Sequence, residues 1–167
     1  NVIRFYAFNV DRTSQRAFMT MELLKGPTLD HLISERQEGL PWLEFQQIAI
    51  PLLEALHASH SLGVLHGDIK PSNVMLTADG LRLFGLGEPL QGLLPGLPRL
   101  SRKRIAAWTP RYAALELLEG GELTEAADLY AVAVILYELI SGHHPFSRLT
   151  AKQAKCMDQN ETLDKPE

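Results

Sequence analysis

Residues 62–76, LGVLHGDIKPSNVML, place polar side chains with chemical potential between two apolar runs. Asp68 can accept a proton or orient a hydroxyl group, Lys70 can place a positive charge beside a phosphate, and Asn73 can offer an amide oxygen to a divalent cation. Phosphoryl transfer uses such groups, because the reaction depends on positioning and on charge stabilisation. The alternative is a structural turn in which Asp68 and Asn73 bond only to backbone amides.

Two segments ahead of this stretch have the composition of strands. Residues 2–8 and 17–24 are rich in aromatic and β-branched side chains, and a polar turn cluster separates them. This pattern predicts a β-hairpin. Gly26 and Pro27 end the second strand, and Thr28 is expected to cap a short helix over residues 29–36.

The polar stretch is expected to lie between a long helix and a pair of short strands. Apolar residues recur at helical spacing over residues 42–60, with Pro51 inside the pattern, where it removes a backbone donor. The predicted buried face of this helix comprises Phe45, Ile48, Ala49, Leu52 and Leu56. Residues 74–76 and 81–84 predict two strands that are joined at the Asp79-Gly80 turn.

Downstream, residues 88–108 form a long connection that is rich in proline and glycine, with a basic cluster at 101–104. Thr124 is expected to cap a second long helix, which Gly142 ends. The predicted buried face of that helix comprises Leu129, Val132, Ala133, Leu136, Tyr137 and Ile140. Residues 147–167 are polar and are expected to form a flexible tail.

Composition excludes several classes of protein. The chain has 167 residues, of which 46% are hydrophobic, so it can bury a substantial core. A net charge of −4 argues against a nucleic-acid partner. No apolar run reaches the roughly 18 residues of a membrane span, and the N-terminus shows no signal-peptide pattern. The single cysteine, Cys156, cannot form an internal disulfide, so a cytoplasmic location is expected.

Three motifs, taken in order, resemble the eukaryotic-type protein kinase family, and in particular bacterial serine/threonine kinases. HGDIKPSN at 66–73 is similar to the catalytic loop His-Arg-Asp-x-Lys-Pro-x-Asn at every position but the arginine. TPRYAALE at 109–116 resembles Thr-Pro-x-Tyr-x-Ala-Pro-Glu. DLYAVAVILYELISGHHPF at 128–146 resembles the helix that anchors the catalytic loop.

The resemblance implies an α+β, protein-kinase-like fold that is mostly the helical C-terminal lobe. Residues 1–24 would be a remnant of the N-terminal lobe, comprising the hairpin and the hinge strand. Residues 25–146 would form the C-terminal lobe with the catalytic loop, the activation segment and the anchoring helix. The polar tail follows.

The same resemblance assigns catalytic and structural roles. Asp68 would orient or deprotonate the acceptor hydroxyl, Lys70 would stabilise the transferring phosphate, and Asn73 would hold one Mg²⁺. Thr109 would link the activation segment to Asp68 and Lys70. Structural roles fall to His66, which would pack on Phe84, to Gly85, to Asp128, which would accept bonds from the loop backbone, and to Glu116.

A nucleotide site is implied as well. Met21 would be the gatekeeper residue, the backbone of Glu22 and Leu24 would bond to adenine, and Met75 would line the floor of the pocket. The resemblance implies ATP and Mg²⁺ as cofactors, and a protein substrate or a regulatory protein as the partner. No nucleic acid and no membrane segment are expected.

The chain departs from the family pattern in three places. It has no Gly-x-Gly-x-x-Gly loop, and the strand lysine and helix glutamate of the N-terminal lobe are missing. The metal segment Asp-Phe-Gly is read as Leu83-Phe84-Gly85, and leucine cannot bind Mg²⁺. Glu88 and Asp79 are the nearest acids that could replace the missing carboxylate. Gly67 replaces the arginine that pairs with a phosphorylated activation loop.

Three functions remain open from the sequence. The first is a serine/threonine protein kinase domain that is truncated and weakly active or inactive, with little binding of ATP and Mg²⁺. The second is a pseudokinase that acts as a regulatory or binding module. The third is a small-molecule phosphotransferase, because His-Gly-Asp is typical of that class. Lys70, together with residues 109–116, favours the protein kinase branch over the third.

Overall fold

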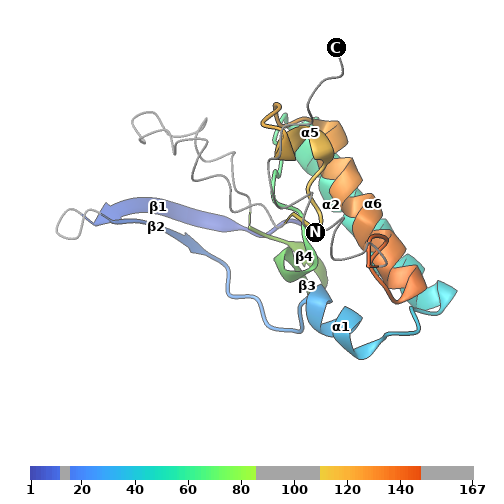
Figure 1. Cartoon of the computed structure of the whole chain (residues 1–167). Coiled ribbons are helices and arrows are strands. Elements are labelled where there is room, and N and C mark those ends of the chain that lie inside the picture. The colour runs from blue at the N-terminus through green and yellow to red at the C-terminus, as the bar shows by residue number, and fades with distance from the viewer. Residues whose placement is uncertain (12–15, 86–109, 148–167) are drawn as a thin grey trace, which may run out of the picture.

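A computed structural model of the chain describes residues 1–11, 16–85 and 110–147. The architecture is α+β, with two separate antiparallel hairpins and two long helices (Figure 1). The elements are, in chain order, β1 (Phe5–Asp11), β2 (Arg16–Met21), α1 (Leu29–Glu35), α2 (Trp42–Ser61), the 3-10 turn η1 (Pro71–Asn73), β3 (Val74–Thr77), β4 (Gly80–Leu83), α5 (Leu115–Leu118) and α6 (Glu125–Ser141).

The β1–β2 hairpin projects as an arm from the body that the helices form (Figure 1). The first strand was predicted to begin at Val2, but it begins at Phe5, because the residues before it pair with β4 instead. The N–H of Leu83 donates to the carbonyl of Asn1 at 2.7 Å, and the N–H of Ile3 donates to the carbonyl of Leu83 at 3.0 Å. The start of the arm is therefore fixed to β4.

The chain that follows the arm is fixed in a similar way to β3, at residues 27 and 28. The N–H of Leu76 donates to the carbonyl of Pro27 at 2.9 Å, and Thr28 forms an isolated bridge with Met75. Thr28 occupies the N-cap position of α1, as predicted, but its side chain makes no capping hydrogen bond. Only its backbone contributes, since its carbonyl accepts the N–H of Leu32 at 3.3 Å.

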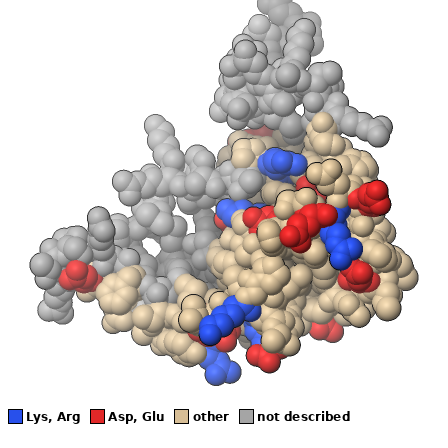
Figure 2. All heavy atoms as spheres, turned by 90° about the horizontal axis from the view of Figure 1, so that it is seen from below, with Lys and Arg blue, Asp and Glu red and all other residues tan. Residues whose placement is uncertain are grey.

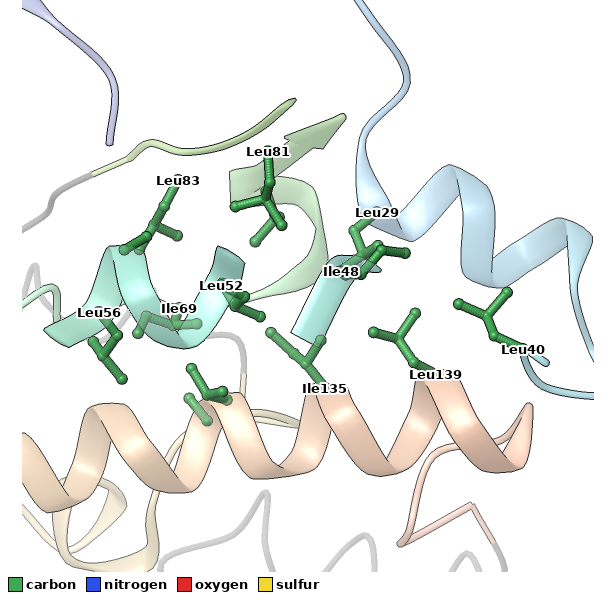
Figure 3. Close-up of a cluster of buried hydrophobic side chains, with 14 residues drawn as sticks. Leu29, Leu40, Ile48, Leu52, Leu56, Ile69, Leu81, Leu83, Ile135 and Leu139 are labelled. Atoms are coloured by element: carbon green, nitrogen blue, oxygen red, sulfur yellow. The ribbon is translucent and has the colours of Figure 1, made fainter. Parts of the chain in front are cut away.

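The core lies between α2 and α6, with β3, β4 and α1 closing it (Figure 3). The predicted face of α2 is confirmed, because Ile48, Ala49, Leu52 and Leu56 are buried and Phe45 packs against the same cluster. Burying one such side chain contributes roughly 1.5–3 kcal/mol. The other buried hydrophobic residues of this core are Leu29, Leu40, Ala55, Ile69, Val74, Leu81, Leu83, Ala131, Val132, Ile135 and Leu139.

The predicted face of α6 is wrong. Of its six members only Val132 is buried, whereas Leu129, Tyr137 and Ile140 are 50%, 45% and 46% exposed. The helix is apolar on more than one side, so its periodicity could not identify the buried side. The face that packs against α2 and the polar stretch carries Asp128, Ala131, Ile135 and Leu139.

The ends of α6 are as predicted. The hydroxyl oxygen of Thr124 accepts the N–H of Ala127 at 3.3 Å, which satisfies one of the free donors in the first turn. Gly142 follows the last turn, and its N–H donates to the carbonyl of Glu138 at 2.9 Å. Both ends of the helix are therefore fixed by local sequence.

On the face shown in Figure 2, Lys and Arg side chains lie next to Asp and Glu side chains, so both signs of charge are interspersed there. In the part of the chain that the structure describes, no helix is both long and apolar enough to cross a membrane.

Candidate active site

The polar stretch runs from the end of α2 through η1 into β3 (Figure 1). Two buried side chains within it, Ile69 and Val74, belong to the core and are 3% and 0% exposed. Because these anchors point inward, Asp68, Lys70 and Asn73 are left half-buried at the surface of the core. The alternation of apolar and polar residues in the sequence therefore determines which side chains face solvent.

One of the two carboxylate oxygens of Asp68 is held by neighbouring side chains of the loop. Its Oδ2 accepts from Lys70 Nζ at 2.7 Å and from Asn73 Nδ2 at 3.3 Å. Asn73 Nδ2 also donates to the backbone carbonyl of Asp68 at 2.8 Å, which closes the loop on itself. Within the described ranges, Asp68 Oδ1 has no hydrogen-bond partner, so this oxygen can accept a bond from a ligand.

Asp128, in the first turn of α6, carries the loop backbone. Its Oδ2 accepts the N–H of His66 and its Oδ1 accepts the N–H of Gly67, both at 2.8 Å. His60 Nε2, at the end of α2, lies 2.9 Å from Asp128 Oδ2. The Asp128 residue is 2% exposed, and such a buried carboxylate is tolerated because it has these donors. This backbone contact is the one expected of Asp128.

Gly67 has a φ of 77°, in the left-handed region that costs an L side chain roughly 1–2 kcal/mol. The resemblance places an arginine at this position. Glycine adopts this backbone conformation, in which its N–H donates to Asp128, more easily than arginine would. Glycine also lacks the positive charge with which an arginine would pair with a phosphorylated segment.

His66 joins the loop to the end of β4. The residue is fully buried; its Nε2 lies 3.0 Å from the carbonyl oxygen of Phe84, and its Nδ1 accepts the N–H of Asp68 at 3.2 Å. The imidazole is therefore the neutral tautomer with the proton on Nε2. Burial lowers its pKa below the ordinary 6.5, and the Phe84 carbonyl opposes that shift. His66 was expected to pack on Phe84, and the contact that the structure shows is a hydrogen bond to the Phe84 backbone carbonyl.

The interpretation of Leu83 as the residue in the metal-ligand position is wrong. Its side chain is 0% exposed and belongs to the core, so it points away from Asn73 and Asp68. Asp79 does not replace it, because Asp79 lies in the exposed turn at the opposite end of the β3–β4 hairpin from Asn73. Glu88 and Thr109 lie outside the described residues.

The residues assigned to adenine lie along the return from the arm to the body. Met21 ends β2 and is 38% exposed, and Met75 is half-buried in β3. The N–H of Glu22 donates to the carbonyl of Arg4 at 3.0 Å. In the part of the chain that the structure describes, the carbonyl of Glu22 and the N–H of Leu24 have no backbone partner.

A second polar cluster was missed by sequence reasoning. The hydroxyl of Tyr112 donates to Glu138 Oε2 at 2.7 Å, and Arg111 lies 3.7 Å from the other carboxylate oxygen. Burial, and next Glu138, raise the pKa of Tyr112 well above its ordinary value. His144 is buried beside this pair, with Nε2 2.8 Å from the carbonyl of Arg111. An acid within an apolar helix, Glu138, was the available signal.

Residues 110–118 bring this cluster to the catalytic stretch. A small cleft lies beside Asp68 and is lined by residues that include Gly67, Tyr112, Ala113, Leu117 and Ala131. Glu116 of α5 is exposed, and among the described residues its carboxylate has no hydrogen-bond or ion-pair partner. Asp68 itself lines this cleft together with Ile69 and Asp128.

Comparisons with known proteins agree with this geometry. A family model described as a protein kinase domain matches residues 1–166. The chain is 35% identical to the serine/threonine-protein kinase PkaA of Streptomyces coelicolor over 134 residues, which cover 77% of this chain and 24% of that protein. It is 30% identical to the serine/threonine-protein kinase PknL of Mycobacterium tuberculosis over 143 residues, which cover 84% of this chain and 34% of that protein.

A third relative is the DNA damage-responsive serine/threonine-protein kinase RqkA of Deinococcus radiodurans. The identity is 36% over 132 residues, which cover 78% of this chain and 20% of that protein. The chain thus spans about a third or less of the length of these three curated relatives.

Proposed function

Since the chain belongs to the protein kinase domain family, we propose that it forms the part of a serine/threonine protein kinase that holds the acceptor hydroxyl and the adenine base. The observation that carries the proposal is the Asp68 carboxylate. Lys70 and Asn73 fix its Oδ2, its Oδ1 has no partner in the described residues, and Asp68 is one of the residues that line the cleft. A carboxylate held in this way can orient a hydroxyl group.

In the proposed reaction, the hydroxyl oxygen of a Ser or Thr of a protein substrate bonds to the γ-phosphorus of ATP. The bond from that phosphorus to the bridging oxygen of ADP breaks, and the hydroxyl proton passes to Asp68 Oδ1. The Lys70 ammonium supplies positive charge beside the transferring group. The substrate segment would approach Asp68 from the side on which Gly67 and Tyr112 lie.

The adenine base is proposed to bond along residues 22–24. The carbonyl of Glu22 would accept from the exocyclic amine, and the N–H of Leu24 would donate to the ring. Met75 would form the floor, because the bridge between Met75 and Thr28 brings β3 beside the end of the arm. The need for ATP and the single cysteine support a cytoplasmic location.

A second candidate is a pseudokinase, a binding or regulatory module with little or no transfer. It is supported by the core position of Leu83, which leaves no carboxylate from β4 near Asn73. The family uses ATP and Mg²⁺, and much of its rate enhancement comes from stabilising charge on the phosphates. We therefore expect this chain alone to transfer phosphate slowly or not at all.

Two measurements test these proposals. Adenine placement is tested by titrating the chain with ATP in EDTA and following binding by calorimetry. Leu24→Pro removes the donating N–H, and we expect roughly a tenfold loss of affinity, as for one hydrogen bond. Leu23→Pro, at an adjacent residue that is 84% exposed, is the matched control. No ATP binding, or equal losses in both variants, would overturn the placement.

Transfer is tested with radiolabelled ATP and a generic basic protein substrate. The pseudokinase candidate predicts the same background rate in the chain and in Asp68→Ala. Turnover that disappears in Asp68→Ala would instead establish an active kinase and exclude the pseudokinase.

A further inference from the structure

The geometry at the end of β4 determines which residue could place a metal-binding side chain next to Asn73. Val74 pairs with Leu83 in the β3–β4 ladder, and the N–H of Phe84 donates to the carbonyl of Asn73 at 2.9 Å. Leu83 is turned into the core, as Figure 3 shows, with Leu56 and Leu81 among its neighbours in the cluster. Two residues further along, Gly85 is exposed and follows the pairing with Asn73.

A side chain added at Gly85 would point at the amide of Asn73. A Cβ built on Gly85 would lie 2.7 Å from Asn73 Cγ and Nδ2 and 2.9 Å from Oδ1. The backbone there has a φ of 82°, a left-handed conformation that Asp and Asn tolerate better than other residues with side chains. A side chain at this position would therefore face Asn73, and the Asn73 amide would have to shift to admit it.

The residues that are present do not fit Mg²⁺. The cation needs oxygen ligands, normally carboxylates, and Asn73 offers one amide oxygen. The nearest carboxylate, Asp68, already shares its Oδ2 with the Lys70 ammonium at 2.7 Å, which disfavours a second cation. The described ranges contain no group of three His, Cys, Asp or Glu residues that could hold a metal ion.

We propose that the chain does not hold a divalent cation at this site, and that the deficiency lies at Gly85: an aspartate there would supply the missing carboxylate beside the Asn73 amide. The inference deepens the proposed function, on which it rests. It moves the position of the missing ligand from Leu83, which is buried in the core, to Gly85, which lies next to the Asn73 amide.

The experiment measures Mn²⁺ binding to the whole chain, without nucleotide, from the loss of the free-ion paramagnetic resonance signal. The unaltered chain should show only weak, non-saturating binding. Gly85→Asp should gain a single site at least about tenfold tighter, since it adds a carboxylate ligand. Gly85→Asn is the matched control, because it has nearly the same size and tolerance of the backbone but no charge. Asn73→Ala in the Gly85→Asp chain should remove the gain.

Several results would overturn the proposal. Saturable Mn²⁺ binding by the unaltered chain would mean that another carboxylate, such as Glu88, completes the site, and Glu88→Gln would identify it. Equal binding by Gly85→Asp and Gly85→Asn would show that Gly85 does not face the site. If circular dichroism shows Gly85→Asp to be unfolded, Asn73→Asp places a carboxylate in the same loop and should also gain binding. Because no nucleotide is used, failure here leaves the adenine placement untouched.

Discussion

At the scale of single residues, Asp128 has the largest structural role. It is buried, it accepts two backbone N–H groups of the catalytic loop, and it lies against His60. Removing one partner from a buried charged network leaves the remaining polar groups without compensation. Asp128 therefore stabilises the loop directly, whereas Asp68 and Lys70 depend on the loop for their positions.

Asp128→Ala should lower the free energy of unfolding by about 3–5 kcal/mol, because it leaves the N–H groups of His66 and Gly67 buried and unpaired. Urea unfolding followed by circular dichroism measures the change. Glu125→Gln is the control, because Glu125 lies 4.0 Å from the same histidine but its side chain is 63% exposed. A loss below about 1 kcal/mol in Asp128→Ala would contradict the role given to Asp128.

The sequence could predict the residue types of the site but not all of their directions. Asp68, Lys70 and Asn73 come together because a short loop with two apolar anchors holds them. The error at Leu83 arose because the direction of a side chain at a strand end depends on the hairpin register. That register follows from a two-residue turn at Ala78 and Asp79. A shift of the register by one residue would turn the side chains that face the core toward the site, and the reverse.

At the scale of elements, α2 was predictable and α6 was only partly so. The buried residues of α2 recur at regular helical spacing, which the periodicity of the sequence identified even though Ile50 and Leu53 of the same helix are exposed. α6 carries apolar residues around much of its circumference, and its buried polar residues, Asp128 and Glu138, belong to the face that sequence patterns would assign to solvent. The buried face combines apolar residues with these two polar ones, so hydrophobic periodicity alone could not identify it.

Two alanine substitutions in α6 test this orientation. Ile135→Ala should destabilise the chain by about 2–4 kcal/mol, because Ile135 is 0% exposed and its removal leaves a cavity. Ile140→Ala should cost less than about 1 kcal/mol, because Ile140 is 46% exposed. Both substitutions shorten the same residue type in the same helix, and urea midpoints compare them. Equal losses would mean that the face of Ile140 is covered as well.

At the scale of the whole molecule, two buried histidines make stability depend on pH. Burial lowers the pKa of both His66 and His144 below the ordinary 6.5. The unfolded chain therefore binds protons that the folded chain excludes, so each proton favours unfolding. The stability that these histidines contribute is complete above pH of about 6.5 and falls as the pH decreases below that value.

We expect the urea midpoint to fall between pH 7 and pH 5, and to fall less steeply in His144→Gln, because glutamine does not titrate. His31→Gln is the control, since His31 is exposed and its imidazole pairs with Glu35 on the surface. The slope with pH is the informative quantity, because His144→Gln also lowers stability at neutral pH by removing a bond to the Arg111 carbonyl. An unchanged slope would contradict the role of His144.

The two attachments of the β1–β2 arm have a mechanical consequence. Asn1 and Ile3 are bonded to Leu83 of β4, and Pro27 is bonded to Leu76 of β3. The base of the arm is therefore linked directly to β4, and the chain that follows the arm is linked to β3 at Pro27, so a tilt of the base pulls on the second hairpin. Asn73 lies directly before the first residue of β3, and Gly85 lies two residues after the last residue of β4. A force applied to the arm would therefore be transmitted through the β3–β4 hairpin to the catalytic loop.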